Sequence, residues 1–203
     1  MTAIFMPTAP GFRASRFGLE THTRRFESDF TRYQQRQLLA GSRWRANFTL
    51  PRMKQQQAAE WQAFLLLLDG GVNTLYAYDP DRRIPRGIAT GTPLVKGASQ
   101  TGSSLLIDGA TASITNWLMV GDYFSVNGEF KMVTSNITTN GSGEATISFK
   151  PALRSAPADN TAILLGTDCY CAMILDDDMQ TMWESNQNGV FTEKSFAATE
   201  VFA

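Results

Sequence analysis

The segment RWRANFTL, residues 43–50, decides the fold of this chain because its polar and apolar side chains alternate strictly. The apolar side chains at positions 44, 46, 48 and 50 share one face of an extended strand, and the polar ones share the other. A slip of one residue in the strand pairing would bury Arg43 and Arg45, so we expect a firm register. The segment therefore predicts a half-buried β-strand beside a hydrophobic core.

The period of the apolar side chains changes directly after this strand. Pro51 is compatible with the first turn of a helix, and Gly70 with Gly71 favours its termination. The apolar residues between them recur at helical spacing: Met53, Trp61, Phe64, Leu65 and Leu68. We expect one amphipathic helix of about 18 residues, about 27 Å long. A short strand over residues 72–78 should follow it.

Residues 84–157 have no helical period and are dominated by Gly, Ser and Thr. Short apolar runs recur between turns, and Asn127-Gly128 is a strong signal for a two-residue hairpin. The expected strands are residues 93–95, 104–107, 117–120, 123–126, 130–133 and 145–149. Such spacing suggests a small barrel or sandwich. We therefore predict a mainly β (α+β) chain in which a domain of residues 1–83 plus 158–203 is interrupted by an inserted β-module of residues 84–157.

The chain before residue 43 has a weaker pattern. Residues 1–18 are rich in Pro, Gly and small side chains with aromatics between them, and are expected to form an extended arm. Residues 19–26 and 30–38 are weak strand candidates. After the module, residues 162–165 and 169–175 return to a strand pattern.

Composition excludes several classes of protein. Of 203 residues, 43% are hydrophobic and 18% charged, which argues against a disordered chain. A net charge of −1 argues against electrostatic nucleic-acid binding by the whole molecule. The longest apolar run, residues 64–68, is far too short to span a membrane. We expect no signal peptide and synthesis in the cytoplasm.

Charge is distributed unevenly along the chain. Residues 1–80 carry 10 basic and 6 acidic side chains, whereas residues 158–203 carry 1 and 8. The two ends either pack together within one domain or meet between copies, as in a closed ring of identical subunits. The candidate interface residues from the basic end, which has aromatics interleaved with its arginines, are Arg24, Arg25, Arg43 and Arg45.

No pattern in the sequence predicts a catalytic, cofactor-binding or metal site. His22 is the only imidazole, and Cys169 with Cys171 supplies too few ligands for zinc. The two cysteines are expected to pack in the core or at a strand edge. The acidic triplet Asp176, Asp177 and Asp178 lacks the spacing of a calcium loop. It is expected to be a solvated edge or to line a pore.

Several stretches of the chain, in this order, resemble those of one protein family. They are residues 12–21 (FRASRFGLET), 41–46 (GSRWRA), 58–64 (AAEWQAF), 76–80 (YAYDP), 121–128 (GDYFSVNG) followed by 130–133 (FKMV), and 149–154 (FKPALR). The chain is similar to distal tail proteins, and to related minor tail components, of long-tailed bacteriophages and gene transfer agents.

The resemblance implies a tail-tube-like β-sandwich with a flanking helix. It also implies a non-enzymatic virion protein that forms a six-membered ring at the tail tip or baseplate. Such a ring joins the tail tube to the hub, DNA passes through its lumen during ejection, and an extra β-module decorates its outside. Because carboxylates facing a lumen would repel phosphate, we expect Asp176, Asp177 and Asp178 to approach it.

Two other classes of function stay open. A receptor- or carbohydrate-binding module would present exposed aromatic rings, with Trp117, Tyr123 and Phe124 as the candidate platform. Packing of these three rings in the core is the favoured interpretation. A tail-associated hydrolase would need paired carboxylates in a cleft. The acids Glu20, Glu27, Glu60, Asp122 and Glu129 show no pairing in the sequence.

Overall fold

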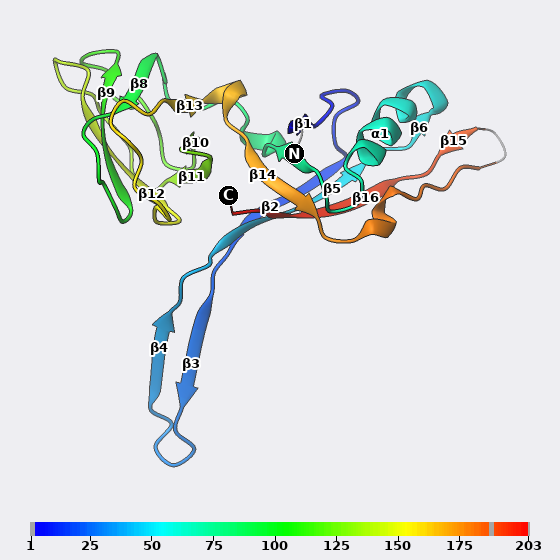
Figure 1. Cartoon of the computed structure of the whole chain (residues 1–203), viewed down its shortest axis with the longest axis horizontal. Coiled ribbons are helices and arrows are strands. Elements are labelled where there is room, and N and C mark those ends of the chain that lie inside the picture. The colour runs from blue at the N-terminus through cyan, green and yellow to red at the C-terminus, as the bar shows by residue number, and fades with distance from the viewer. Residues whose placement is uncertain (1–2, 187–188, 203) are drawn as a thin grey trace.

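The computed structural model describes residues 3–186 and 189–202, and is mainly β with one α-helix among these residues (Figure 1). Its first sheet contains six strands in the order β1-β7-β14-β16-β5-β2, of which β1 and β7 are parallel and the other neighbours antiparallel. The strands are β1 (Ala3–Phe5), β2 (Ala14–Glu20), β5 (Arg43–Leu50), β7 (Thr74–Ala77), β14 (Cys171–Leu175) and β16 (Lys194–Glu200). The predicted strand 43–50 is confirmed as β5, whose alternate residues are buried.

The second sheet is a nearly closed, barrel-like sheet of six strands in the order β13-β10-β11-β12-β9-β8. The strands are β8 (Gly91–Val95), β9 (Ser104–Ala110), β10 (Tyr123–Val126), β11 (Glu129–Val133), β12 (Ala145–Lys150) and β13 (Ile163–Leu165). Leu94 forms a bridge with Ala162, which brings the two edges together. Asn127 and Gly128 both have positive φ and join β10 to β11, as the hairpin signal predicted.

Three local expectations differ from the structure. Residues 117–120 form no strand; Leu118 makes a single bridge with Ile137. Residues 1–18 are not one free arm, because β1 and β2 pair within the first sheet. The strand β13 pairs with β10, so the second sheet extends past residue 157 and the chain returns to the first sheet at β14. In each case pairing with a distant strand decides the outcome.

The helix α1 (Gln55–Leu67) lies against the first sheet, where Trp61, Phe64 and Leu65 are buried. It is shorter than predicted because Met53 and Lys54 form the strand β6 (Met53–Lys54), which pairs with β15 (Val190–Phe191). Burial of these large side chains stabilises the fold by about 1.5–3 kcal/mol each. None of the helices in the described part of the chain is long and apolar enough to cross a membrane.

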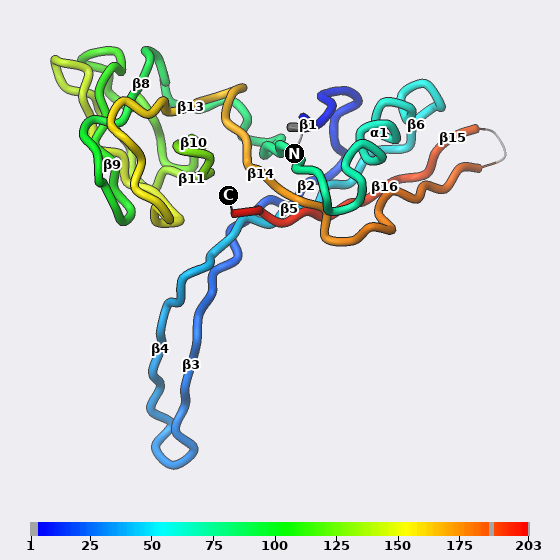
Figure 2. Tube along the Cα trace, in the orientation of Figure 1, coloured from blue at the N-terminus to red at the C-terminus, as the bar shows by residue number. Residues whose placement is uncertain are grey.

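A long hairpin projects from the first sheet between β2 and β5. Its strands, β3 (Thr23–Glu27) and β4 (Gln34–Leu38), pair with each other alone and are exposed along their whole length. Figure 2 shows this hairpin extending well away from both sheets. We call residues 21–42 the projecting arm.

The two sheets share a junction centred on Trp44. Its indole ring, only 2% exposed, lies 5.5 Å from Phe130 and 5.7 Å from Tyr123 of the barrel, measured between ring centroids. The indole N–H donates a 2.9 Å hydrogen bond to the carbonyl of Phe130. One strand of the first sheet therefore contributes its largest side chain to a contact with the second sheet.

A buried ion network surrounds this junction. Arg154 donates two hydrogen bonds, of 2.7 and 2.9 Å, to the carboxylate of Glu200, which also accepts the backbone N–H of Trp44. Beside it, Lys131 donates to Glu129 over 2.6 Å, and Glu129 accepts the backbone N–H groups of Arg154 and Ser155. The network joins β11 and the segment after β12 to β5 and β16.

We predict that Trp44→Ala lowers the free energy of unfolding by about 3–5 kcal/mol, since it leaves a cavity between the two sheets and an unpaired carbonyl. Urea denaturation followed by fluorescence measures the change. The control is Phe30→Ala in the arm, where the side chain is 100% exposed and the change should stay within about 0.5 kcal/mol. Equal effects of both variants would contradict this account of the junction.

We also predict that acid destabilises the fold through Glu129. Burial by itself would raise the pKa of this carboxyl, but the hydrogen bonds from Lys131 and from the backbone of Arg154 and Ser155 outweigh burial and lower it. A carboxyl with a lowered folded-state pKa stabilises the fold above its unfolded pKa, and this contribution is lost as pH falls through the folded value. Urea midpoints should therefore fall below about pH 4.3. Glu129→Gln should flatten that dependence; an unchanged pH profile would contradict the assignment.

Candidate functional site

The projecting arm carries two of the four predicted interface arginines. Arg25 stands directly opposite Arg36 in the β3–β4 register, and two like charges in that position destabilise a hairpin. Within the described part of the chain, neither of these two arginines has an ion-pair partner. Arg24 lies on the other face, with its guanidinium 5.0 Å from the centroid of Phe26. The arm thus presents uncompensated positive charge.

Apolar side chains are also exposed along the arm. Phe26 is 53%, Tyr33 75% and Leu38 65% exposed, and Phe30 at the tip is completely exposed. A two-stranded hairpin without a third strand or a covering layer is marginally stable in water. The arm is therefore a marginally stable hairpin with several large apolar side chains exposed to solvent.

The other two predicted arginines, Arg43 and Arg45, lie at the base of the arm on β5. Arg45 forms an ion pair of 2.7 Å with Glu20 on the neighbouring strand β2. Arg43 lies over the ring of Phe202, 5.8 Å from its centroid. Arg43 and Arg45 thus have partners within the chain, whereas Arg25 and Arg36 of the β3–β4 hairpin have no ion-pair partner among the described residues.

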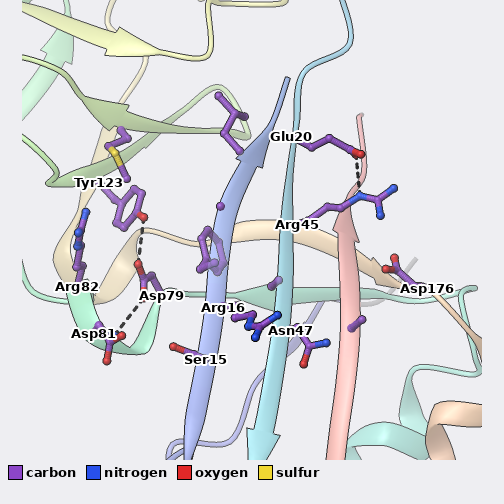
Figure 3. Close-up of a pocket in the computed structure, with 16 residues that line it drawn as sticks. Ser15, Arg16, Glu20, Arg45, Asn47, Asp79, Asp81, Arg82, Tyr123 and Asp176 are labelled. Atoms are coloured by element: carbon purple, nitrogen blue, oxygen red, sulfur yellow. Dashed lines mark hydrogen bonds and ion pairs between the residues drawn. The ribbon is translucent and has the colours of Figure 1, made fainter. Parts of the chain in front are cut away.

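A broad groove of about 930 Å³ lies beside β2 and β5 (Figure 3). Tyr123 donates a 3.0 Å hydrogen bond to Asp79, which also accepts the backbone N–H of Asp81. Burial and the adjacent Asp79 carboxylate raise the pKa of Tyr123, so its hydroxyl stays protonated at neutral pH. In the close-up, β2 and β5 lie between Tyr123 and Asp176. Tyr123 and Asp79 are thus hydrogen-bonded to each other at the wall of the groove.

The acidic triplet follows β14 and is exposed to solvent, but its members have different partners. Asp176 accepts a hydrogen bond from the hydroxyl of Thr199. Asp177 caps the short 3₁₀ helix η3 (Asp178–Thr181) by accepting the backbone N–H of Met179 over 2.8 Å. Asp178 lies against Gly70, whose φ of +67° favours glycine at that position. A position beside a lumen stays a prediction for all three.

The three aromatic residues of the candidate carbohydrate platform are core residues, as the favoured interpretation predicts, and they form no exposed platform. Trp117 and Phe124 are completely buried, and Tyr123 is 5% exposed. Trp117 donates its indole N–H to the carbonyl of Thr90, and Phe124 packs at right angles to Phe149. These rings fill the barrel and its junction, because a small barrel needs large side chains to fill its interior.

The remaining candidate groups have structural surroundings. Cys169 and Cys171 are free and buried, as expected, and burial raises the pKa of the Cys169 thiol to about 12. His22 is exposed and makes a 3.0 Å hydrogen bond to the carbonyl of Ala40 in the arm. In the parts of the chain described here, no three His, Cys, Asp or Glu side chains are grouped as a metal ion requires.

The sequence indicated Arg24 and Arg25 as interface candidates, but it did not predict that the hairpin carrying them projects from the first sheet. The interleaved pattern of arginines and aromatics in residues 24–38 was the available signal. Whether such a pattern lies on a sheet or projects from it depends on strand pairing, which the sequence leaves open. Comparison of the chain with models of known protein families gives no match, and comparison with curated protein sequences gives none either.

We predict that Asp177→Ala lowers the free energy of unfolding by about 1 kcal/mol, because η3 loses the side chain that caps its first turn. Asp177→Asn keeps an oxygen acceptor at the same position and is the matched control. Thermal and urea denaturation would measure both. An equal loss in the two variants would show that the charge of Asp177, rather than the cap, stabilises this segment.

Proposed function

We propose that this chain is a non-enzymatic structural subunit that assembles with copies of itself into a ring at the distal end of a bacteriophage or gene-transfer-agent tail. The observation that carries the proposal is the projecting arm. Its exposed aromatic side chains and its opposed Arg25 and Arg36 require a partner surface. The resemblance of residues 12–154 to distal tail proteins supplies the class of assembly.

Two further features support an assembly role. The hydrogen bond of Trp44 and the Arg154–Glu200 ion pair connect the barrel to the first sheet, which suits a structural subunit of a ring. The opposite charges of the two chain ends suit head-to-tail contacts between identical subunits, which close into a ring when the rotation allows.

The finer architecture belongs to the same proposal. The first sheet with α1 would be the tail-tube-like sandwich that forms the ring, and the barrel would be the module on its outside. The ring would have six copies, would connect the tail tube to the hub, and would leave a lumen for DNA. The chain would be made in the host cytoplasm and would function in the virion.

Light scattering with negative-stain microscopy tests the proposal. We expect a mass of about 134 kDa, six times the 22.4 kDa of one chain, together with ring-shaped particles. Salt should weaken the assembly where exposed charges hold it, because 1 M salt shortens the screening length to about 3 Å. A monomer at every concentration, both alone and with purified tail tube, would contradict the proposal.

A carbohydrate-binding function is favoured by one separate observation. Phe5, Tyr76 and Tyr170 line an apolar groove of about 400 Å³, and the Phe5 ring lies 5.2 and 5.0 Å from the two tyrosine rings. Sugar rings stack on such exposed aromatic faces. A glycan array probed with the full chain and with Tyr170→Ala distinguishes this function, since loss of a specific glycan signal in the variant would support it.

A further inference from the structure

The arm needs a partner surface that combines apolar side chains with negative charge. Its own strands offer no such surface, since the side chains around Arg25 and Arg36 on the same face are Thr23, Leu38 and the Glu27–Gln34 pair. Glu27 is already engaged by a 3.0 Å hydrogen bond from Gln34. Glu27 balances one of the two positive charges of the opposed arginines, and the excess charge is available to a partner surface.

One surface of the same chain has the matching composition. The C-terminal end of α1, the turn after it and η3 adjoin one another, and the Asp178 carboxylate lies against Gly70 at their contact. Five apolar side chains in these segments are 60–66% exposed: Leu66, Leu67, Val72, Met179 and Met182. We call these residues, with the exposed carboxylates of Asp69, Asp177 and Asp178, the α1–η3 surface.

The charge of this surface is opposite to that of the arm. Its three carboxylates are accompanied by one cation, Lys194, whose ammonium group is held by the carbonyl of Met182. The projecting arm carries four arginines against Glu27 and Asp29. The α1–η3 surface therefore combines apolar side chains with carboxylates, and the projecting arm combines apolar side chains with guanidinium groups. The two surfaces are complementary in charge and both are apolar in part.

The two surfaces cannot meet within one molecule as it is folded. Figure 1 shows the tip of the arm and α1 far apart, on opposite sides of the first sheet. A contact between them must therefore join two copies. It uses different surfaces on the two partners, and contacts of this kind close into rings or continue as filaments.

We infer that the arm of one copy docks on the α1–η3 surface of the next copy, with Leu38, Phe30 and Tyr33 against its apolar side chains. Arg25 and Arg36, on the same face of the hairpin as Leu38, then point toward its carboxylates. That these contacts close into a ring rests on the proposed function. The contact between two copies is the same whether the assembly is a ring, a filament or a dimer. It assigns Asp177 and Asp178 to an interface between copies in place of a lumen.

The experiment combines charge reversal with photo-crosslinking in the full chain. Arg25→Glu/Arg36→Glu should weaken self-association about tenfold or more, because like charges would then face each other across the contact. Asp178→Lys should weaken it in the same direction. A mixture of these two variants should regain association, since each supplies the surface that the other lacks. Arg52→Glu/Lys150→Glu, at two exposed positions outside both surfaces, changes the net charge equally and should leave association unchanged.

The crosslinks locate the contact. A photo-reactive benzoylphenylalanine in place of Phe30 should link to residues 66–72 or 179–182 of another copy, as mass spectrometry of mixed isotope-labelled chains can show. Rings whose crosslinks map elsewhere would overturn the docking site and leave the ring function standing. Crosslinks at the α1–η3 surface in dimers or filaments, without rings, would support the docking site and overturn the ring. Absence of self-association, or crosslinks to added DNA instead of protein, would overturn the docking site.

Discussion

The contact between Trp44 and the barrel is the constraint on which the rest of the structure depends. Trp44 belongs to β5, the strand that pairs with both β2 and β16 in the first sheet. Its indole ring packs against Tyr123 and Phe130 of the second sheet. The alternation that buries Trp44 also sets the register of β5. One strand therefore fixes its own sheet and the position of the barrel on it.

The ion network around Glu200 gives this contact its specificity. A buried carboxylate is tolerated only where charged and hydrogen-bonding partners replace water. Arg154 supplies a bidentate pair from the chain after β12, and the backbone N–H of Trp44 supplies a further bond. Hydrophobic packing alone would allow the two sheets to slide, whereas these bonds require one relative position. A rigid body of this kind can support a projecting arm whose own strands contribute little to stability.

The sequence predicted the secondary structure best where short-range patterns decide it. The alternation over residues 43–50, the hairpin at Asn127-Gly128 and the apolar period of residues 61–65 all reappear in the structure. The sequence favoured core packing for Trp117, Tyr123 and Phe124 but left a surface platform open, because an aromatic ring has the same local pattern in a core as on a surface. Trp117 and Phe124 become core residues only once the barrel curves around them.

Sequence patterns alone predict a mainly β protein with one helix, and composition places basic and acidic side chains at opposite ends of the chain. These properties follow from periods of two and 3.6 residues and from composition, which act locally. The tertiary structure alone decided that residues 21–42 project as an arm, that Glu200 meets Arg154, and that α1 adjoins η3. Such contacts join residues far apart in the chain, and their geometry depends on how the two sheets pack.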